Sequence, residues 1–493
     1  MHSNPTSILG GTCVARGSIW ASVPTEPLLR LWLSVIAVWL GLATRLPAGD
    51  VALQLATFRV DVTPAVGESP CAGFLRRVDS IEHPLELRGV IFKSGTQTFV
   101  IAAIDFCGIS NSSDETLRDA LARAAGTSRD RVALQSLHQH SAPVLDLEAV
   151  RLLHGPDSAI VRQHLEFTET IAIRATQAIQ KVLDSRINVR RIVCSRALVD
   201  RVASNRRVPR GDGTIAVRTS LTREPTVRDA PEGLIDPWLR TITFHGERGA
   251  LVQLHYYATH PQTFYGDQRI SWDCVGMARE QFQQESGIFQ IYFNGCGGNI
   301  TVGKYNDGTR EARRQLADRL MAAMRRSSQS DSVIVDFQTE SLDTSEIQWQ
   351  TASLGFQPRE AGRFARAAIV SQMQQTKSWD TRLAATMFHS FQERLRSGQQ
   401  GQASRLRIGP LDLLHLPGEP FVEYQLFAQQ VGAGVSPGSF VCVAGYGDCG
   451  VWYYGPDTMY REPGGFEQTW SFTGPCQVSV EEAIKTLLRR TDD

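Results

Sequence analysis

The feature that most constrains the fold of this chain is the repeated alternation of short apolar strands and helices along the sequence. Strands predicted from alternating or continuous apolar runs are 55–64, 89–110, 131–143, 240–261, 287–303, 332–342, 406–420 and 439–456. Helices predicted from apolar residues at helical spacing are 112–126, 159–184, 309–326, 358–375, 420–431 and 479–490. Strands that alternate with helices are typical of an α/β fold, and hairpins such as 240–261 make the sheet mixed. We therefore predict an α/β protein with a mixed β-sheet core and flanking helices.

Four of these predicted strands end in polar or glycine-rich turns. They are "LHQHSAP" (137–143), "YATHPQT" (257–263), "FNGCGGNIT" (293–301) and "AGYGDCGVWYY" (444–454). Ligands of α/β proteins bind where strands end. We therefore expect the site of this protein, a metal site, at these strand ends.

Two histidines in the first turn suggest a metal. His138 and His140 stand two residues apart on the predicted strand 131–143, so their side chains would share one face. A partly buried pair satisfied by backbone hydrogen bonds is the alternative. His260 ends a second strand in the same way, whereas His255, five residues earlier, would face the other side and is expected to be structural. Spacing alone does not link His138 to His260.

Charge argues against one class of partner. Lysine and arginine number 51, and aspartate and glutamate also number 51. A nucleic-acid-binding surface needs excess positive charge to release counterions from phosphate, so we expect no nucleic-acid partner. The region 204–231 is rich in Arg, Gly, Asp and Pro, which predicts a loop.

The amino terminus resembles an export signal. An uncharged apolar run, Leu31–Thr44, follows Arg30 and is shorter than the about 20 residues of a membrane span. We expect residues 1–48 to be a signal peptide with a long leader or an uncleaved anchor, with a buried helix as the third interpretation. Residues 55–493 would then form a single domain of a secreted or cell-envelope (periplasmic) protein. Of nine cysteines, eight would remain after cleavage, which permits disulfides, and none lies in a CxxC pair.

Six segments, taken in order over residues 56–470, resemble the neutral, non-lysosomal ceramidase family of secreted zinc amidases. They are "SLHQHSAP" (136–143), "SNRR" (204–207), "YYATHPQT" (256–263), "GGNIT" (297–301), "LPGEP" (416–420) and "AGYGDCGVWYY" (444–454). The set in this order is more specific to the family than to any one substrate.

The resemblance implies a zinc site. Its ligands would be His138, His260, Glu419 and Tyr453, with Tyr454 as the alternative tyrosine. Imidazole and carboxylate ligands suit zinc, and an open position for water makes such a site catalytic. Without the resemblance, Glu419 would be interpreted as a carboxylate at a helix amino terminus and Tyr453 as an aromatic packed under a loop.

Three further residues receive catalytic roles from the resemblance. His140 would donate a proton to the leaving amine, Arg206 would stabilise the developing oxyanion, and Thr301 would stand where the family has a serine. The neighbours of Thr301 differ from the family pattern, with Asn299 for an aspartate and Val302 for a proline. The "GCGGN" turn either presents backbone N–H groups to an anion or is a tight structural turn.

Two carboxylates complete the expected surroundings of the metal. Asp105 and Asp273 are candidates to orient its ligands through hydrogen bonds.

The implied function is zinc-dependent hydrolysis of an amide by metal-activated water, with an N-acyl sphingoid lipid (ceramide-like) as substrate and association with a membrane surface. The family usually carries an additional carboxyl-terminal sandwich domain, and this chain stops soon after "GGFEQTW", which suggests a divergent member. One alternative is a zinc esterase or amidase that acts on a small non-lipid molecule. The other is a catalytically inactive, secreted binding protein of the same fold.

Overall fold

The first sheet of the molecule has a core of strands, β3, β4 and β6, whose side chains are mostly buried on both faces. The computed structural model describes residues 53–68, 77–264, 268–329, 333–336, 346–436 and 438–489. Strand order in this sheet is β6-β4-β3-β1-β8. The strands are β1 (Gln54–Asp61), β3 (Glu86–Ser94), β4 (Gln97–Ile104), β6 (Val132–Ser136) and β8 (Ile187–Asn188). The hairpin β3–β4 closes at Gly95, whose φ of 54° suits a tight two-residue turn, whereas β4 and β6 are parallel.

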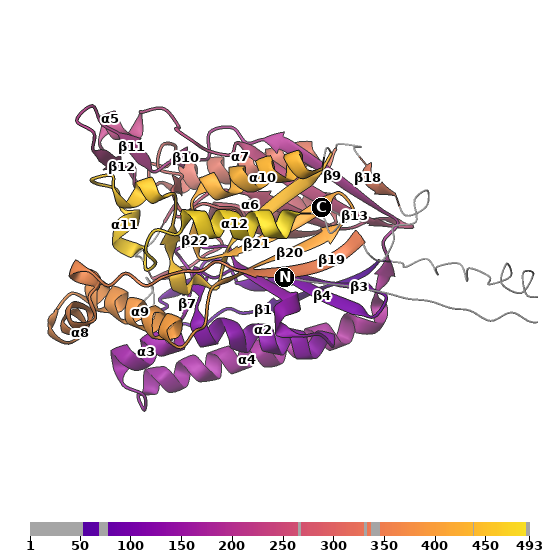
Figure 1. Ribbon diagram of the computed structural model, residues 1–493. Helices are drawn as coiled ribbons and strands as arrows, with labels where there is room; N and C mark the ends of the chain where they lie inside the picture. Colours follow the sequence, from indigo (N-terminus) through magenta and orange to yellow (C-terminus); the bar gives the residue numbers. More distant parts are fainter. Residues whose placement is uncertain are drawn as a thin grey trace, which may run out of the picture. The chain divides into compact units, whose positions relative to one another are not determined.

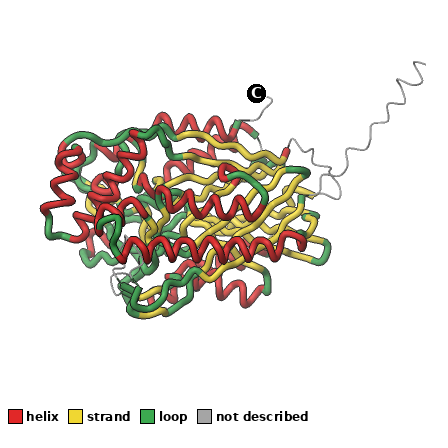
Figure 2. The backbone as a smooth tube through the Cα atoms, turned by 90° about the horizontal axis from the view of Figure 1, so that it is seen from below, coloured by secondary structure: helices red, strands yellow, loops and turns green. Residues whose placement is uncertain are grey.

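Helices α2 (Asn111–Ala125) and α4 (Ala159–Val182) cover one face of this sheet (Figures 1 and 2). The buried residues of α4 recur every three or four positions, so one apolar stripe faces inward. Helix α3 (Leu147–His154) lies between the two in the chain and begins at Asp146, whose carboxylate accepts a hydrogen bond from the Ala149 amide.

The second sheet has the order β16-β14-β13-β9-β18. Its strands are β9 (Arg191–Leu198), β13 (Trp238–Gly246), β14 (Gly249–Tyr257), β16 (Phe289–Asn294) and β18 (Val333–Asp336). Strands β14 and β16 are parallel, and helix α6 (Asp273–Ser286) makes the crossover between them. Helix α7 (Arg310–Ser328) packs on β9 and β13.

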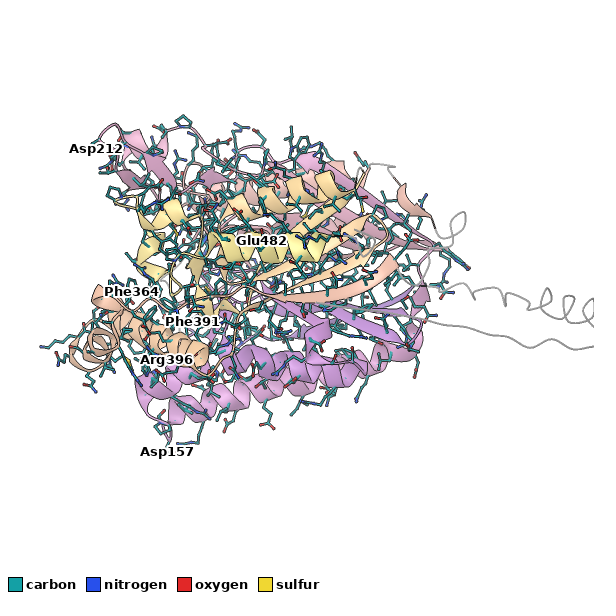
Figure 3. All side chains as sticks on the ribbon, viewed as in Figure 1. Asp157, Asp212, Phe364, Phe391, Arg396 and Glu482 are labelled. Carbon is teal, nitrogen blue, oxygen red and sulfur yellow. The ribbon has the colours of Figure 1, made fainter. Side chains whose placement is uncertain are left out.

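The third sheet has the order β19-β20-β21-β23. Its strands are β19 (Ile347–Ser353), β20 (Gln402–Ile408), β21 (Leu411–Pro417) and β23 (Phe440–Gly447). Helix α10 (Val422–Val435) connects the parallel pair β21 and β23, and α12 (Gln477–Leu488) packs on α10, with Glu482 on its outer face (Figure 3). Helices α8 (Arg366–Gln375) and α9 (Trp379–Arg396) pair with each other, and Phe391 of α9 is buried there (Figure 3).

Short elements fill the end of the molecule where the candidate site lies. They are β2 (Ser80–Ile81), β5 (Gly108–Ile109), β7 (Val144–Leu145), β10 (Ser204–Asn205), β11 (Arg207–Pro209), β12 (Ile215–Val217), α5 (Pro225–Arg228), β15 (Arg269–Ile270), β17 (Ile300–Thr301), β22 (Glu419–Pro420), β24 (Tyr453–Tyr454) and α11 (Glu467–Trp470). Strands β6, β16 and β23, one from each sheet, contact one another. The turns that follow them therefore meet at one place.

The predicted α/β class with a mixed sheet and flanking helices is confirmed. Three local predictions were wrong. The strand 131–143 is too long, because β6 ends at Ser136; the loop 204–231 contains the β11–β12 hairpin; and helices α3, α6 and α9 were not predicted.

Residues Val51–Asp493 form one compact unit, and the leader or anchor predicted at 1–48 lies outside the described residues. The cysteine count permitted disulfides, but the described cysteines are buried free thiols: Cys107, Cys194, Cys274, Cys296, Cys442, Cys449 and Cys476. Among the described residues no helix combines the length and the apolar character needed to cross a membrane.

Candidate metal centre

His138 has an unusual backbone conformation just beyond the end of β6. Its φ is +65°, a left-handed value that costs free energy for a residue with a side chain and that often marks functional sites. The ring Nδ1 lies 2.6 Å from the Cys107 carbonyl oxygen and donates to it. In a neutral ring protonated at Nδ1 the Nε2 atom presents a lone pair, and here Nε2 lies 3.1 Å from Oε2 of Glu419.

Glu419 stands opposite His138 as a buried carboxylate. It lies in β22, and its backbone is held by a hydrogen bond from its own amide to the Trp452 carbonyl. Its side chain is fully buried, and neither carboxylate oxygen has a hydrogen-bond partner among the described residues. A buried carboxylate is costly unless a cation compensates it. The lone pair of His138 and the carboxylate of Glu419 therefore fit a bound cation between them.

His260 completes a set of three donors. It follows the end of β14, and its ring Nδ1 lies 3.3 Å from the Gly297 carbonyl oxygen and 4.0 Å from Oε2 of Glu419. Donor atoms of His138, His260 and Glu419 all lie within 4.8 Å of one another, and all three residues are buried. Burial, together with Arg206 and His138, lowers the pKa of His260 well below its usual value. A neutral imidazole is the form that binds metals, so this donor set can hold a metal ion.

His140 lies against the same cluster, but not because of strand geometry. The prediction placed both histidines on one face of a strand, yet β6 ends before either, and the left-handed turn at His138 brings the rings together with centroids 5.0 Å apart. Nδ1 of His140 receives a hydrogen bond from the Gln262 amide at 3.2 Å, and Nε2 lies 3.0 Å from Nε2 of His260. Burial, followed by His138 and Arg206, lowers the pKa of His140 well below its usual value. The ring is therefore neutral.

Of the two adjacent tyrosines, Tyr453 faces the cluster and Tyr454 does not. Strand β24 pairs in parallel with β22, which sets Tyr453 beside Glu419. The ring of Tyr453 stacks parallel to that of His260 at 6.5 Å, whereas the Tyr454 hydroxyl donates to the Pro417 carbonyl inside the core. Burial and the nearby Glu419 carboxylate raise the pKa of Tyr453 well above its usual value.

Arg206 reaches the cluster from the segment between β10 and β11. Its guanidinium donates to the Tyr453 hydroxyl at 3.1 Å. Burial works to lower the pKa of Arg206, but Tyr453 and Glu467 outweigh it and the pKa is raised, so the side chain stays charged. The structure thus places a fixed positive charge next to the histidines and Tyr453.

Thr301 is held in the scaffold beside Arg206. It pairs with Ser204 across the β10–β17 ladder, and its hydroxyl accepts a hydrogen bond from the Gly303 amide. Thr301 thus lies opposite Ser204, two residues before Arg206, and supports the strand that leads into it.

The "GCGGN" turn serves as a tight structural turn. The amides of Cys296 and Gly298 donate to the Gln425 side chain and the Pro420 carbonyl, so neither is free for an anion. The side chain of Asn299 bonds both the Val422 amide and Glu423 at the start of α10. The turn thus ties the Glu419 segment to the Gly297 carbonyl that supports His260.

The two predicted supporting carboxylates have other partners. Asp105 forms a buried two-point ion pair with Arg279. Asp273 accepts hydrogen bonds from the Thr263 amide and hydroxyl, which holds the chain just after His260. Neither has a recorded contact with the ring of a clustered histidine. His255 is hydrogen-bonded to Thr241 and Gln290 in the second sheet, as expected of a structural histidine.

Tyr446 is a residue of the cluster that the sequence did not reveal. Its ring stacks on His138 with centroids 4.3 Å apart, and its buried hydroxyl has no hydrogen-bond partner among the described residues. Like His138, it has a left-handed φ, here +63°. The only signal in the sequence was its place in the segment that carries Tyr453. Cys107 also belongs here, since its sulfur lies 4.0 Å from Nδ1 of His138.

Comparisons with known proteins support the fold. No protein-family model and no curated protein sequence matches the chain. Solved structures similar to it include the following two. A structure described as a ceramidase complexed with C2 has a TM-score of 0.64 and 13% identity over 89% of this chain and 75% of that one. The neutral ceramidase from Pseudomonas aeruginosa has a TM-score of 0.63 and 15% identity over 89% and 74%. The chain therefore has a ceramidase-like fold.

Proposed function

We propose that this chain is a zinc-dependent amidohydrolase that cleaves an N-acyl amide of the ceramide type with an activated water molecule. One observation carries the proposal: the lone pair of His138 Nε2 faces the buried, unpartnered carboxylate of Glu419 at 3.1 Å, beside a second neutral histidine. The ceramidase-like fold supports the amide as the bond that is cleaved and a lipid as the substrate.

The proposed metal ligands are His138, His260, Glu419 and Tyr453. Nitrogen and oxygen donors of this kind suit zinc. When bound, zinc polarises the carbonyl of the amide and lowers the pKa of a water molecule to about 7. The phenol of Tyr453, whose pKa is raised in the absence of a metal, would bind as the weakest of the four ligands.

The surrounding residues supply the remaining chemistry. Arg206 is buried, charged and already hydrogen-bonded to Tyr453, so it can stabilise negative charge that develops on the amide oxygen. His140 is neutral, and its Nδ1 accepts a hydrogen bond from Gln262, so Nε2 carries the ring proton and is the donor that would face the leaving amine. We include Thr301 in the proposal only as a neighbour that fixes the strand before Arg206.

Metal analysis combined with amide hydrolysis tests the proposal. We expect purified protein to carry one zinc ion per chain and to release fatty acid from an N-acyl sphingoid amide. Glu419→Gln should lose both zinc and activity, because a neutral amide no longer compensates the ion. Glu423→Gln, four residues further along and bound to Asn299, is the matched control and should keep zinc.

The alternatives predict different results. If the protein hydrolyses small polar amides or esters but no lipid amide, the substrate is a non-lipid molecule and the proposed lipid substrate is wrong. A protein that binds no zinc and hydrolyses nothing would contradict the enzyme proposal and favour a binding protein of the same fold.

A further inference from the structure

A turn near the carboxyl end of the described chain covers the buried arginine of the site. We refer to residues 464–467, "GGFE", as the GGFE turn. The ring of Phe466 lies over the guanidinium of Arg206 at 5.5 Å and meets the ring of Tyr453 edge-on at 6.0 Å. Arg206 and Tyr453 are 4% and 3% exposed, whereas Phe466 is 40% exposed. Phe466 is therefore an apolar surface between solvent and the hydrogen-bonded pair Arg206 and Tyr453.

Ion pairs hold the GGFE turn in place. The guanidinium of Arg207 donates to Glu467 at 2.8 Å and to Glu462 at 2.6 Å. Glu467 is fully buried, so this interaction is shielded from water. Arg206 and Arg207 are adjacent, and one points to Tyr453 while the other points to the turn. The same two residues therefore fix the distance between the site and Phe466.

Backbone packing restricts the GGFE turn further. Gly464 has a φ of +85°, and a Cβ atom at this position would lie 2.3 Å from the Ile215 carbonyl oxygen. The Ile215 amide also donates to the Pro463 carbonyl. The turn is thus packed directly on the β11–β12 hairpin, and Phe466 is a fixed surface rather than a free side chain.

We propose that Phe466 is a specificity-determining residue, against which an apolar chain on one side of the scissile amide packs. The inference rests on the proposed amidohydrolase function. An aromatic ring that lies over Arg206 and is 40% exposed offers apolar area directly beside the group that would hold the amide oxygen. A short polar substituent gains nothing from that area, whereas a long apolar chain covers it. Phe466 therefore selects by chain length.

Two matched series of amides test this role in the zinc-loaded protein. One varies the acyl group from acetyl to dodecanoyl on a fixed amine, and the other varies the amine on a fixed acyl group. For wild-type protein we expect kcat/KM to rise with chain length in at least one series. In Phe466→Ala, the ratio of kcat/KM for the longest chain to kcat/KM for the shortest chain in that series should fall about tenfold. The change should appear mainly in KM, because the lost contact is made in the ground state and the transition state alike.

Two further variants separate the effect of apolar bulk from that of the aromatic ring and from general surface effects. Phe466→Leu keeps apolar bulk without an aromatic ring and should retain most of the chain-length preference. Val478→Ala removes another exposed apolar side chain, on α12, and should leave the ratio unchanged. Binding of dodecanoate to wild type and Phe466→Ala, measured by calorimetry, gives a readout that does not need turnover.

The outcomes are distinguishable from failure of the proposed function. If wild type hydrolyses amides and Phe466→Ala keeps the same ratio in both series, the role of Phe466 is wrong and the hydrolase stands. If wild type hydrolyses amides but shows no chain-length preference, the role of Phe466 is also wrong and the hydrolase stands. If wild type hydrolyses no amide, the proposed function fails, whatever the dodecanoate binding shows.

Discussion

At the scale of single residues, the two histidines of the first turn should behave differently. His138 presents a lone pair to Glu419, so His138→Ala should remove zinc and activity together. His140 has both nitrogens engaged by Gln262 and His260, so His140→Ala should keep zinc while kcat falls by about 10²–10⁴. Bound zinc measured by elemental analysis, together with rates of amide hydrolysis, checks both expectations.

A third histidine is the control for this comparison. His255 is equally buried but bonds only to Thr241 and Gln290, so His255→Gln should lose stability and still bind one zinc ion. Loss of zinc from His140→Ala with retention in His138→Ala would show that the two roles are reversed.

At the scale of elements, the start of helix α3 should make stability depend on pH. Burial, followed by Glu148, raises the pKa of Asp146 to about 7. Between the unfolded pKa near 4 and pH 7, the folded state holds a proton that the unfolded state has released. The free energy of unfolding therefore falls as the pH rises through this window, by about 1.4 kcal/mol for each unit of pKa shift at most.

Denaturant unfolding between pH 4 and pH 7 tests this expectation with Asp146→Asn. Asparagine still caps the helix, since its oxygen can accept from the Ala149 amide, but it does not titrate. The stability of the variant relative to wild type should increase as the pH rises. Asp212→Asn, on an exposed loop (Figure 3), is the control: Thr214 lowers the pKa of Asp212, so its small contribution has the opposite sign.

The glycine turn after β16 is a second element whose packing can be tested. A Cβ atom on Gly297 would lie 2.2 Å from the Thr259 carbonyl oxygen, and the Gly297 carbonyl supports His260. Gly297→Ala should therefore destabilise the fold by a few kcal/mol, on the order of ~1–3 for overpacking, and weaken zinc binding. Gly434→Ala, inside α10 with open space around it, should be neutral or stabilise by about 0.5–1 kcal/mol. Thermal unfolding and zinc titration of the pair distinguish them.

At the scale of the whole molecule, zinc should couple the three sheets. The clustered donors come from segments that follow β6 and β14 and from β22. A ligand that binds only the folded state stabilises it by about 2.7 kcal/mol at a free concentration of 100 Kd, or about 3 °C in Tm for a chain of this size. Calorimetry with zinc and with a chelator should show this shift. It should vanish in His138→Ala, and its survival there would place the zinc elsewhere.

The sequence by itself determined the local elements and the segments that carry chemistry. Helical spacing located α4, α7 and α12, and paired apolar runs around glycine located the β3–β4 and β13–β14 hairpins. These signals are local, because a helix or a hairpin is formed by residues near in the chain. The resemblance of six short segments to one family added the expected fold, which the comparisons with solved structures confirm.

Only the tertiary structure decided how the candidate residues meet. The β22–β24 register sets Tyr453, and not Tyr454, beside Glu419. The role of Tyr446 in the cluster could not be predicted from the sequence, because stacking on a residue about 300 positions away leaves no local pattern. His138 and His140 converge through a left-handed turn, since a strand would have required β6 to continue past Ser136. Strand register, long-range stacking and the point at which β6 ends fixed these three arrangements, and periodicity in the sequence encodes none of them.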